Sequence, residues 1–240
     1  MIRRILLLLL SLVLILPTSF IFSQYLKVGF LLGSPYAFWS GNTFKGIECD
    51  IWKAVSQEIG YQLEVYVLPF SAISPEILTK LSMDVVVGGI HMTDERKKLY
   101  DFGTPYMDSG LAIVTRSDLK WDGRPESITF GVKKGATGET IVQQWNQSGR
   151  KVKYISYVSN EEIITHLLIK KIDGAFFDYI NALYLAKMYG LTVQKQLIYT
   201  TKIGYISLNK ELKSRIDKAV QKLIQENKIR QIIASYVGNY

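Results

Sequence analysis

Only one cysteine, Cys49, occurs among the 240 residues of this chain. A single thiol excludes an internal disulfide, so packing alone must hold the folded chain together. Cys49 lies near the start of a segment with helical apolar spacing, where a buried and unreactive thiol is the expected state.

Apolar runs long enough to cross a membrane are missing after residue 24. The N-terminus differs, because Arg3 and Arg4 precede an apolar block over residues 5–16, interrupted only by Ser11, and a short exit that ends at Gln24. This order is typical of a secretory signal peptide, so we expect residues 1–24 to be removed and the protein to be exported to the periplasm. No cysteine follows that could be lipidated, so we do not expect a lipoprotein.

An uncleaved membrane anchor is the alternative for this segment. Residues 5–22 approach the roughly 20 residues that span a bilayer. Ile21 also stands in the exit where a smaller residue is common before a cleavage site.

A concentrated basic region is missing as well. Lysine and arginine number 29 against 21 aspartate and glutamate, a formal charge of +8, but they are spread along the chain and do not alternate with aromatic residues. We therefore discount nucleic acid as a partner. The composition, with 48% apolar residues, is that of a globular protein, and roughly 215 residues after the signal segment suffice for one large or two small domains.

Short apolar strands alternate with helices along the mature chain, which is the pattern of parallel βαβ units in an α/β fold. In the first half the spacing predicts strands over 26–32, 63–68, 84–87 and 111–115, and helices over 47–59 and 72–81. The alternation restarts at Ser127, which indicates a second lobe. There it predicts strands over 128–132, 152–157, 174–177 and 202–208, and helices over 137–147, 160–169, 179–188, 210–225 and 228–237.

The stretch over residues 84–106 combines several features of a ligand site. Its apolar run, Val85–Val87, is short and β-branched, which favours a buried strand. Gly88–Gly89 would let the backbone approach another molecule closely, and Thr93 is placed to cap a following helix. Arg96 then falls in the first turn, at the positive end of the helix dipole, where a guanidinium is disfavoured without an anion nearby. We therefore expect an anionic partner, with a solvated surface arginine as the alternative.

This stretch resembles a signature of the extracellular solute-binding proteins of family 3, the polar amino-acid receptors of bacterial ABC importers. The small-residue turn and x-T-x-x-R segment of that family match residues 91–96, and its D-F-x-x-P-Y segment matches residues 101–106. Residues 46–51 resemble the G-F-D-V-D-L segment that starts the first long helix, so we expect Glu48 to belong to a helix N-terminus rather than to a site. Residues 133–139 resemble a K-x-G-T-T turn.

The resemblance implies an α/β, two-lobed periplasmic binding protein-like II fold, in which each lobe is a βαβ sheet flanked by helices. Residues 25–114 and 202–240 would form the first lobe and residues 115–201 the second. Two crossings, near 112–116 and 200–204, would form a hinge.

The resemblance also implies that the two lobes bind opposite ends of a free amino acid. Arg96 would hold the α-carboxylate through two parallel hydrogen bonds, joined by the backbone N–H of Thr137. Asp178, at the end of an apolar strand, would hold the α-ammonium together with the carbonyl of Gly89. The alternative role for Asp178 is a helix N-cap.

Aromatic residues follow the first two strands, and the resemblance places Tyr36 and Phe70 against the ligand side chain, whereas an ordinary core role is the alternative. A cationic side chain would suit stacking between these rings. Leu31 and Leu32, however, stand near positions where some basic-amino-acid binders carry an acid, so a polar, glutamine-like ligand stays open.

His91 departs from the family, whose members usually carry serine or threonine there to help hold the ammonium. A neutral imidazole can accept that hydrogen bond, but a protonated one would repel the ammonium. We therefore expect His91 to weaken binding as the pH falls from about 8 to about 5.

The implied function is capture of a polar or cationic amino acid by hinge closure and its delivery to an ABC transporter permease, by a monomer with no cofactor, no metal and no enzymatic activity. Two alternatives stay open. One is a dehydratase of prephenate-like or arogenate-like acids on the same fold, for which Glu48, Glu139 or His91 could serve as general acid. The other is an amino-acid sensor domain that keeps its N-terminal membrane anchor.

Overall fold

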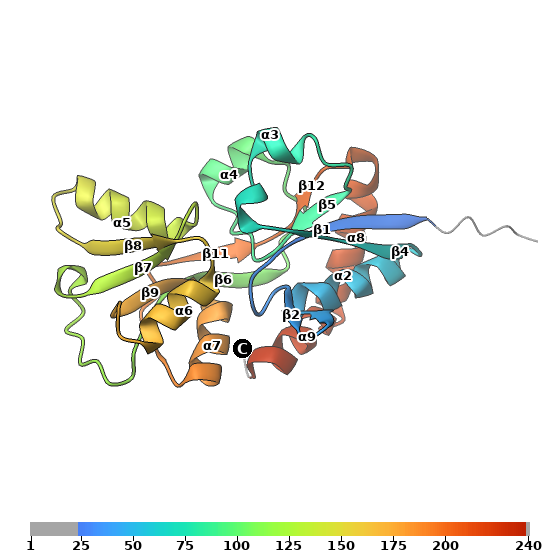
Figure 1. Cartoon of the computed structure of the whole chain (residues 1–240). Helices are drawn as coiled ribbons and strands as arrows, with labels where there is room; N and C mark the ends of the chain where they lie inside the picture. Colours follow the sequence, from blue (N-terminus) through green and yellow to red (C-terminus); the bar gives the residue numbers. More distant parts are fainter. Residues whose placement is uncertain (1–23, 239–240) are drawn as a thin grey trace, which may run out of the picture.

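Two larger β-sheets organise the chain, and two neighbouring strands run between them (Figure 1). The structure is a computed structural model and describes residues 24–238. The expected signal peptide therefore lies outside the described residues, apart from Gln24. No helix within 24–238 is both long and apolar enough to cross a membrane.

The sheet of the first lobe is built on β1 (Tyr25–Leu31), which pairs in parallel with β4 (Gln62–Leu68) and with β5 (Val85–Val87). All three residues of β5 are buried, as its β-branched composition predicts. The short strand β12 (Ile206–Ser207) joins the other edge of β5 in the antiparallel direction. The parallel strands end at one edge of the sheet, where ligands bind in many α/β proteins.

Helices cover both faces of this sheet. On one face α2 (Ile47–Glu58), α8 (Lys210–Gln225) and α9 (Lys228–Val237) share a core with β1 that includes the fully buried Trp52. On the other face lie the short helices α3 (Pro75–Leu78) and α4 (Asp94–Leu99) (Figure 1). The C-terminal helices thus pack on the first lobe, as the resemblance implied.

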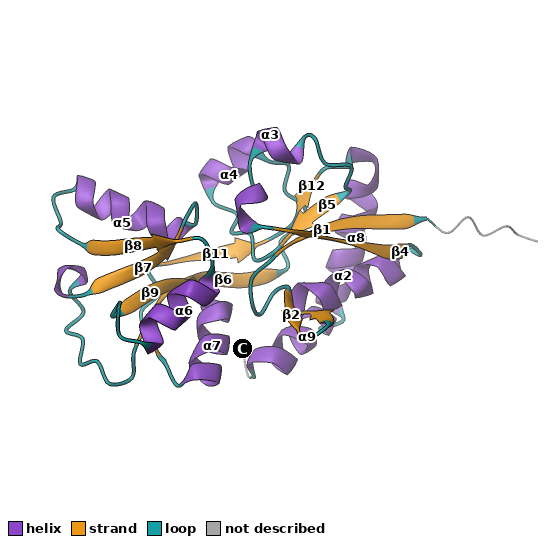
Figure 2. Ribbon diagram, in the orientation of Figure 1, coloured by secondary structure: helices purple, strands orange, loops and turns teal. Residues whose placement is uncertain are grey.

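The sheet of the second lobe has β9 (Gly174–Asp178) and β8 (Lys153–Tyr157) in parallel on either side of β7 (Thr129–Lys133). Helix α5 (Thr137–Gln147) covers one face, and α6 (Asn160–Leu168) and α7 (Tyr179–Tyr189) cover the other (Figure 2). The shorter elements are β2 (Phe38–Ser40), β3 (Thr43–Lys45), the 3₁₀ turns Phe70–Ala72 and Pro125–Ser127, and β10 (Thr192–Val193). This two-lobed α/β arrangement is the predicted fold class.

The crossing strands are β6 (Met107–Thr115) and β11 (Tyr199–Ile203), which pair antiparallel with Met107 opposite Ile203 and Leu111 opposite Tyr199. The sequence placed the first crossing near 112–116 and the end of the first segment of lobe 1 at 114. Strand pairing differs, because residues 111–115 pair with β9 inside the second sheet. The first crossing therefore lies nearer residues 107–110. The buried run continues through both regions, so apolar spacing alone could not locate the boundary.

Two other predicted elements are shorter in the structure than the sequence indicated. The strand expected over 202–208 is interrupted at Gly204–Tyr205 and divides into the end of β11 and β12. The helix expected over 72–81 is limited to α3, because Ser74 caps a helix that starts at Pro75.

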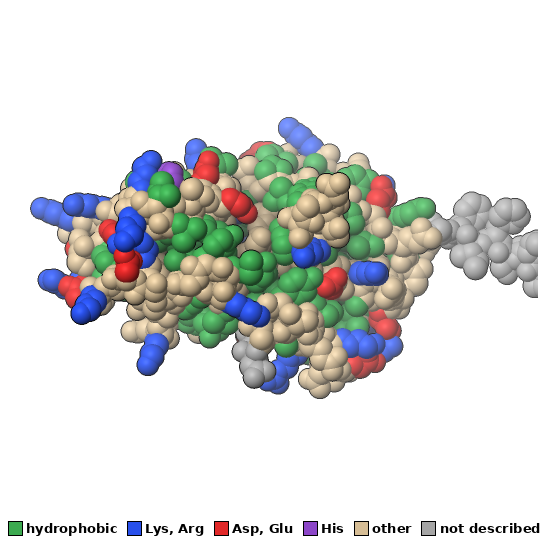
Figure 3. All heavy atoms as spheres, turned by 60° about the horizontal axis from the view of Figure 1, so that its bottom comes forward, with side chains coloured by type: hydrophobic (Ala, Val, Ile, Leu, Met, Phe, Trp, Pro, Cys, Tyr) green, Lys and Arg blue, Asp and Glu red, His purple; other side chains and the backbone are tan. Residues whose placement is uncertain are grey.

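Basic side chains are dispersed over the face shown in Figure 3, whereas apolar side chains gather over its middle. The net positive charge therefore forms no continuous basic surface on that face.

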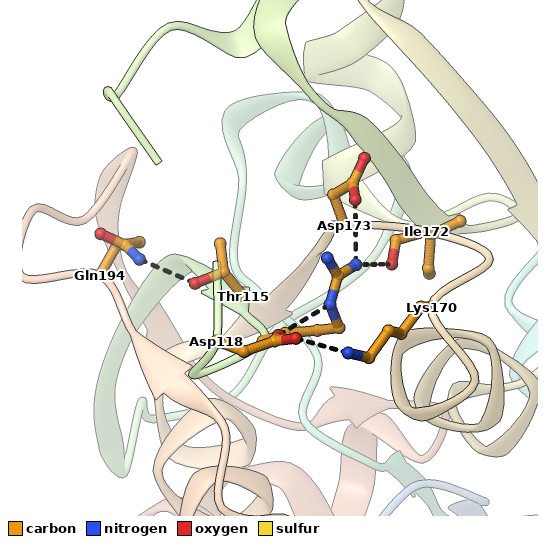
Figure 4. A network of polar contacts seen from close by, with 7 residues as sticks. Thr115, Asp118, Lys170, Ile172, Asp173 and Gln194 are labelled. Atoms are coloured by element: carbon orange, nitrogen blue, oxygen red, sulfur yellow. Dashed lines mark hydrogen bonds and ion pairs between the residues drawn. The ribbon is translucent and has the colours of Figure 1, made fainter. Parts of the chain in front are cut away.

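A polar network closes the far end of the second sheet (Figure 4). Arg116, directly after β6, donates from Nη1 to Asp173 Oδ1 and to the carbonyl of Ile172, both at 2.9 Å, and from Nε to Asp118 at 3.1 Å. The other oxygen of Asp173 accepts the backbone N–H of Thr129 at 3.0 Å. One mostly buried guanidinium thus ties together the ends of β6, β7 and β9.

We expect Arg116→Met to lower the free energy of unfolding by about 1 to 2 kcal/mol, because Asp173 and the Ile172 carbonyl lose their partner. Urea denaturation followed by circular dichroism measures this change. Lys97→Met, which removes an exposed pair with Asp94, is the control and should change stability by no more than about 0.5 kcal/mol. Equal effects of the two substitutions would contradict a stabilising role for the network.

Candidate functional site

A cavity lies between the lobes. The first lobe lines it with residues from the loops after β1, β4 and β5, and the second with the end of β9 and the start of α5. All seven residues that the sequence suggested for ligand binding line it: Tyr36, Phe70, Gly89, His91, Arg96, Thr137 and Asp178. Folding therefore brings them together, and their role in binding stays a prediction.

Arg96 is the third residue of α4, and its backbone N–H donates to the capping hydroxyl of Thr93 at 3.3 Å. Its guanidinium turns back toward the cavity, where Nη1 donates to the carbonyl of His91 at 3.3 Å. Burial lowers the pKa of Arg96, but a guanidinium is so strongly basic that it stays a cation. Within residues 24–238 no carboxylate lies at ion-pair distance from it. The group is thus positioned to bind an anion.

The turn after β5 requires its two glycines. Gly88 has φ of 142° and Gly89 has φ of 66°, a region that favours glycine. A Cβ on Gly88 would lie 2.4 Å from that of Leu31, and one on Gly89 would lie 2.5 Å from the ring of Tyr36. The backbone therefore passes directly beneath the tyrosine ring at the wall of the cavity.

Glu48 binds the backbone of this turn on the side away from the cavity. It lies in the first turn of α2, as expected, but its fully buried carboxylate accepts the backbone N–H of Gly89 at 2.8 Å and the hydroxyl of Tyr106. Burial raises the pKa of Glu48 to about 7. Glu48 thus lies at the helix N-terminus as expected and does not line the cavity, but it also supports the Gly88–Gly89 turn through a contact between residues 41 apart in the chain, which the sequence did not indicate.

Asp178 is the helix N-cap that was its alternative role, and its binding of an ammonium stays a prediction. Its Oδ1 caps α7 by accepting the backbone N–H of Asn181 at 3.0 Å, and its carboxylate also lines the cavity. The hydroxyl of Tyr36, from the other lobe, donates to the same oxygen. Burial raises the pKa of Asp178 to about 6, while Tyr36 and the cap hydrogen bonds act in the opposite direction.

His91 is 5% exposed, and its Nδ1 lies 2.8 Å from the hydroxyl of Tyr199 on β11. Burial, with the charge of Arg96 as a second cause, lowers the pKa of His91 to about 3. The expected titration of His91 between pH 8 and pH 5 is therefore wrong, because the imidazole stays neutral in that range. Its buried Nε2 has no hydrogen-bond partner among the described residues.

Thr137 is the first residue of α5, next to Gly138 in the cavity wall. The first N–H groups of a helix have no intrahelical acceptor, so those of Thr137 and Gly138 are available to a carboxylate. A Cβ on Gly138 would lie 2.6 Å from that of Phe176, so glycine lets this helix start close to β9.

Lys133, Asn160 and Asn181 also line the cavity and were not selected from the sequence. The Lys133 ammonium lies 4.1 Å from the centroid of the Phe70 ring, a contact between the lobes. A lysine before a glycine turn is a weak signal by itself, and strand pairing was needed to place its side chain at the cavity.

The chain matches the model for bacterial extracellular solute-binding proteins, family 3, over residues 26–239. The chain belongs to this family. PatH of Vibrio harveyi, provisionally named an amino-acid ABC transporter-binding protein, is 23% identical over 85% of this chain and 84% of its own.

Two solved structures are similar along most of this family 3 chain. An ancestral arginine-binding protein bound to glutamine is 26% identical, with a TM-score of 0.78 over 90% of this chain and 98% of that one. The ancestral amino acid-binding protein AncCDT-1, described as a precursor of cyclohexadienyl dehydratase, is 22% identical with a TM-score of 0.77 over 89% of this chain and 95% of that one. At that identity the second likeness concerns the fold alone.

We expect Glu48→Gln to change how stability depends on pH. The folded pKa of Glu48 is raised above its ordinary 4.5, so its contribution is fully present below about pH 4.5 and is lost as the pH rises through about 7. Glutamine cannot ionise, so the variant should resemble the wild type at pH 5 and gain up to about 3 kcal/mol relative to it at pH 8.

Urea denaturation at pH 5 and pH 8 checks this expectation. Glu76→Gln, at an exposed position, serves as the control and should run parallel to the wild type. A Glu48→Gln profile that also ran parallel would show that burial does not perturb this carboxyl.

Proposed function

We propose that this protein captures a free amino acid between its lobes and delivers it to the permease of an ABC importer. The supporting observation is that Arg96, without a carboxylate partner within residues 24–238, and Asp178 face one cavity from different lobes. An α-amino acid carries the complementary pair of charges a short distance apart.

In this proposal Arg96 and the N–H groups at the start of α5 bind the α-carboxylate. Asp178 and the carbonyl of Gly89 bind the α-ammonium, and Tyr36, Phe70 and His91 contact the rest of the ligand. Because the two charged groups belong to different lobes, a bound ligand stabilises the arrangement in which the lobes lie close together. A micromolar affinity corresponds to about 8 kcal/mol, which two charge-assisted contacts and ring burial can supply.

We further propose that the mature protein acts in the periplasm as a monomer after removal of residues 1–24, and that it binds its ligand without changing it. Glu48 was one possible general acid for a dehydratase. Its carboxylate is instead engaged by Gly89 and Tyr106 behind the cavity wall.

Thermal denaturation in the presence of each of the twenty amino acids, and of prephenate, tests the proposal. A ligand that binds only the folded protein raises the melting temperature by mass action. We expect at least one amino acid to do so with no product formed. Conversion of prephenate would instead support the dehydratase, and no shift with any amino acid would overturn the proposed ligand class.

Arg96→Ala and Asp178→Asn should each weaken binding of the identified amino acid by about 2 to 5 kcal/mol, because a charge of the ligand would be buried without its partner. Isothermal titration calorimetry measures this loss, and circular dichroism checks the fold. Arg124→Ala, at an exposed arginine paired with Asp122, is the control and should bind as the wild type does. Wild-type affinity in both cavity variants would place the site elsewhere.

The affinity should fall as the pH is lowered through about 6. The pKa of Asp178 is raised to about 6 in the free protein, and the ligand ammonium prefers the ionised form. Binding should therefore weaken by up to about tenfold per unit below pH 6. Calorimetry from pH 7.5 to pH 5 measures this slope, which Asp178→Asn should abolish.

His91→Gln should keep the slope, because a neutral imidazole contributes no titration in that window. The pKa of Glu48 is also raised, to about 7, so Glu48→Gln is the second control. This variant should keep the slope as well. A slope that disappeared with His91→Gln would contradict the assignment to Asp178.

A further inference from the structure

Lys133 places a second cation in the cavity, and the fold fixes its position. It is the last residue of β7, and its carbonyl accepts the backbone N–H of Ala136 at 3.0 Å, which closes the turn before α5. Val132 before it is buried in the core of the second lobe, so strand alternation directs the side chain of Lys133 to the opposite side. There the ammonium meets the ring of Phe70, 4.1 Å away.

This ammonium has no ion-pair or hydrogen-bond partner of its own within residues 24–238. Burial lowers the pKa of Lys133 to about 8, and the carboxylates of Glu161 and Asp178 act only as more distant charges. Glu161 is exposed in the first turn of α6. A half-buried lysine with its donors unused can bind a hydrogen-bond acceptor.

The charges of the cavity can be compared with those of an α-amino acid. In the proposed complex the α-carboxylate pairs with Arg96 and the α-ammonium pairs with Asp178. No charge of the amino-acid backbone is then left to pair with Lys133. A ligand side chain that ends in a cation would meet this ammonium at short range and would compete with it for the face of Phe70. A side chain that ends in a carbonyl oxygen would accept its hydrogen bond instead.

Asn181 supports the same assignment. It is 1% exposed, it lines the cavity, and its buried Oδ1 has no hydrogen-bond partner among the described residues. An asparagine amide can present either its oxygen or its NH₂ group to a ligand, because the two orientations differ only by a flip. Lys133 and Asn181 together thus suit a planar carboxylate or carboxamide.

We propose that Lys133 determines the specificity of this site by selecting an amino acid whose side chain ends in a carboxylate or carboxamide and by rejecting arginine and lysine. This inference rests on the proposed function, since it concerns the side chain of the same ligand.

Calorimetry with L-glutamate, L-glutamine, L-aspartate, L-asparagine, L-arginine, L-lysine and L-leucine tests the inference. We expect at least one of the first four to bind about tenfold or more tightly than arginine, lysine and leucine. Lys133→Met should lower the affinity for that ligand by about 10- to 100-fold, the range for a lost hydrogen bond to a charged group. The ratio of its affinity to that of arginine should fall as well. Lys133→Arg keeps the charge and should retain the preference.

Lys134→Met is the matched control, because Lys134 is the exposed neighbour and does not line the cavity. It should leave all affinities unchanged. Tighter binding of arginine, lysine or leucine by the wild type would overturn the inference and leave the proposed function standing, as would an unchanged preference in Lys133→Met. Failure of every amino acid to bind would overturn both.

Discussion

The paired strands β6 and β11 link the two lobes. The relative position of the lobes, which these strands set, decides which side chains meet in the cavity. Two contacts across the cavity join side chains of different lobes, and a third joins the first lobe to the link itself. Tyr36 reaches Asp178, Phe70 lies against Lys133, and His91 meets Tyr199 on the crossing strand itself. Five of these six side chains, all but Tyr199, also line the cavity. A ligand that enters must replace or share these contacts, which couples its binding to the position of the lobes.

Burial moves most titratable groups of the site toward their neutral forms. The pKa values of Glu48 and Asp178 are raised, and those of Lys133 and His91 are lowered. Arg96 is the exception because its ordinary pKa is too high for burial to discharge it. The cavity thus holds the fixed charge of Arg96 beside groups whose charged forms a bound ion of opposite sign would stabilise. A ligand with both charges can therefore shift these groups to their charged forms when it binds. In a site of permanently paired ions, the ligand would first have to break the ion pairs.

The sequence predicted the fold well where a physical signal is local. Helical spacing located α5, α8 and α9 to the residue, because each combines an apolar face with a clear start and end. The position of Arg96 followed from a strand, a glycine pair and a capping threonine that are close together in the chain. The resemblance to family 3 then placed Asp178 opposite it, which periodicity alone could not do.

Features that depend on distant contacts were missed or misplaced. Nothing near Glu48 in the sequence indicates that its carboxylate reaches Gly89, and the low pKa of His91 follows from burial that becomes visible only in three dimensions. The first crossing was placed too late because the apolar run of β6 continues without a break into the second sheet. The strands β2 and β3 have only three residues each, which is too short to give a periodic signal.

The return of β12 to β5 makes the first lobe discontinuous, with the second lobe inserted between its two parts. Most of the second lobe is built from one uninterrupted segment. During synthesis from the N-terminus, the second lobe can therefore complete its sheet before the ribosome has released the helices that cover the first. The first lobe must wait for α8 and α9 to shield the apolar face of β1, and its long-range pairing is the slower step of assembly.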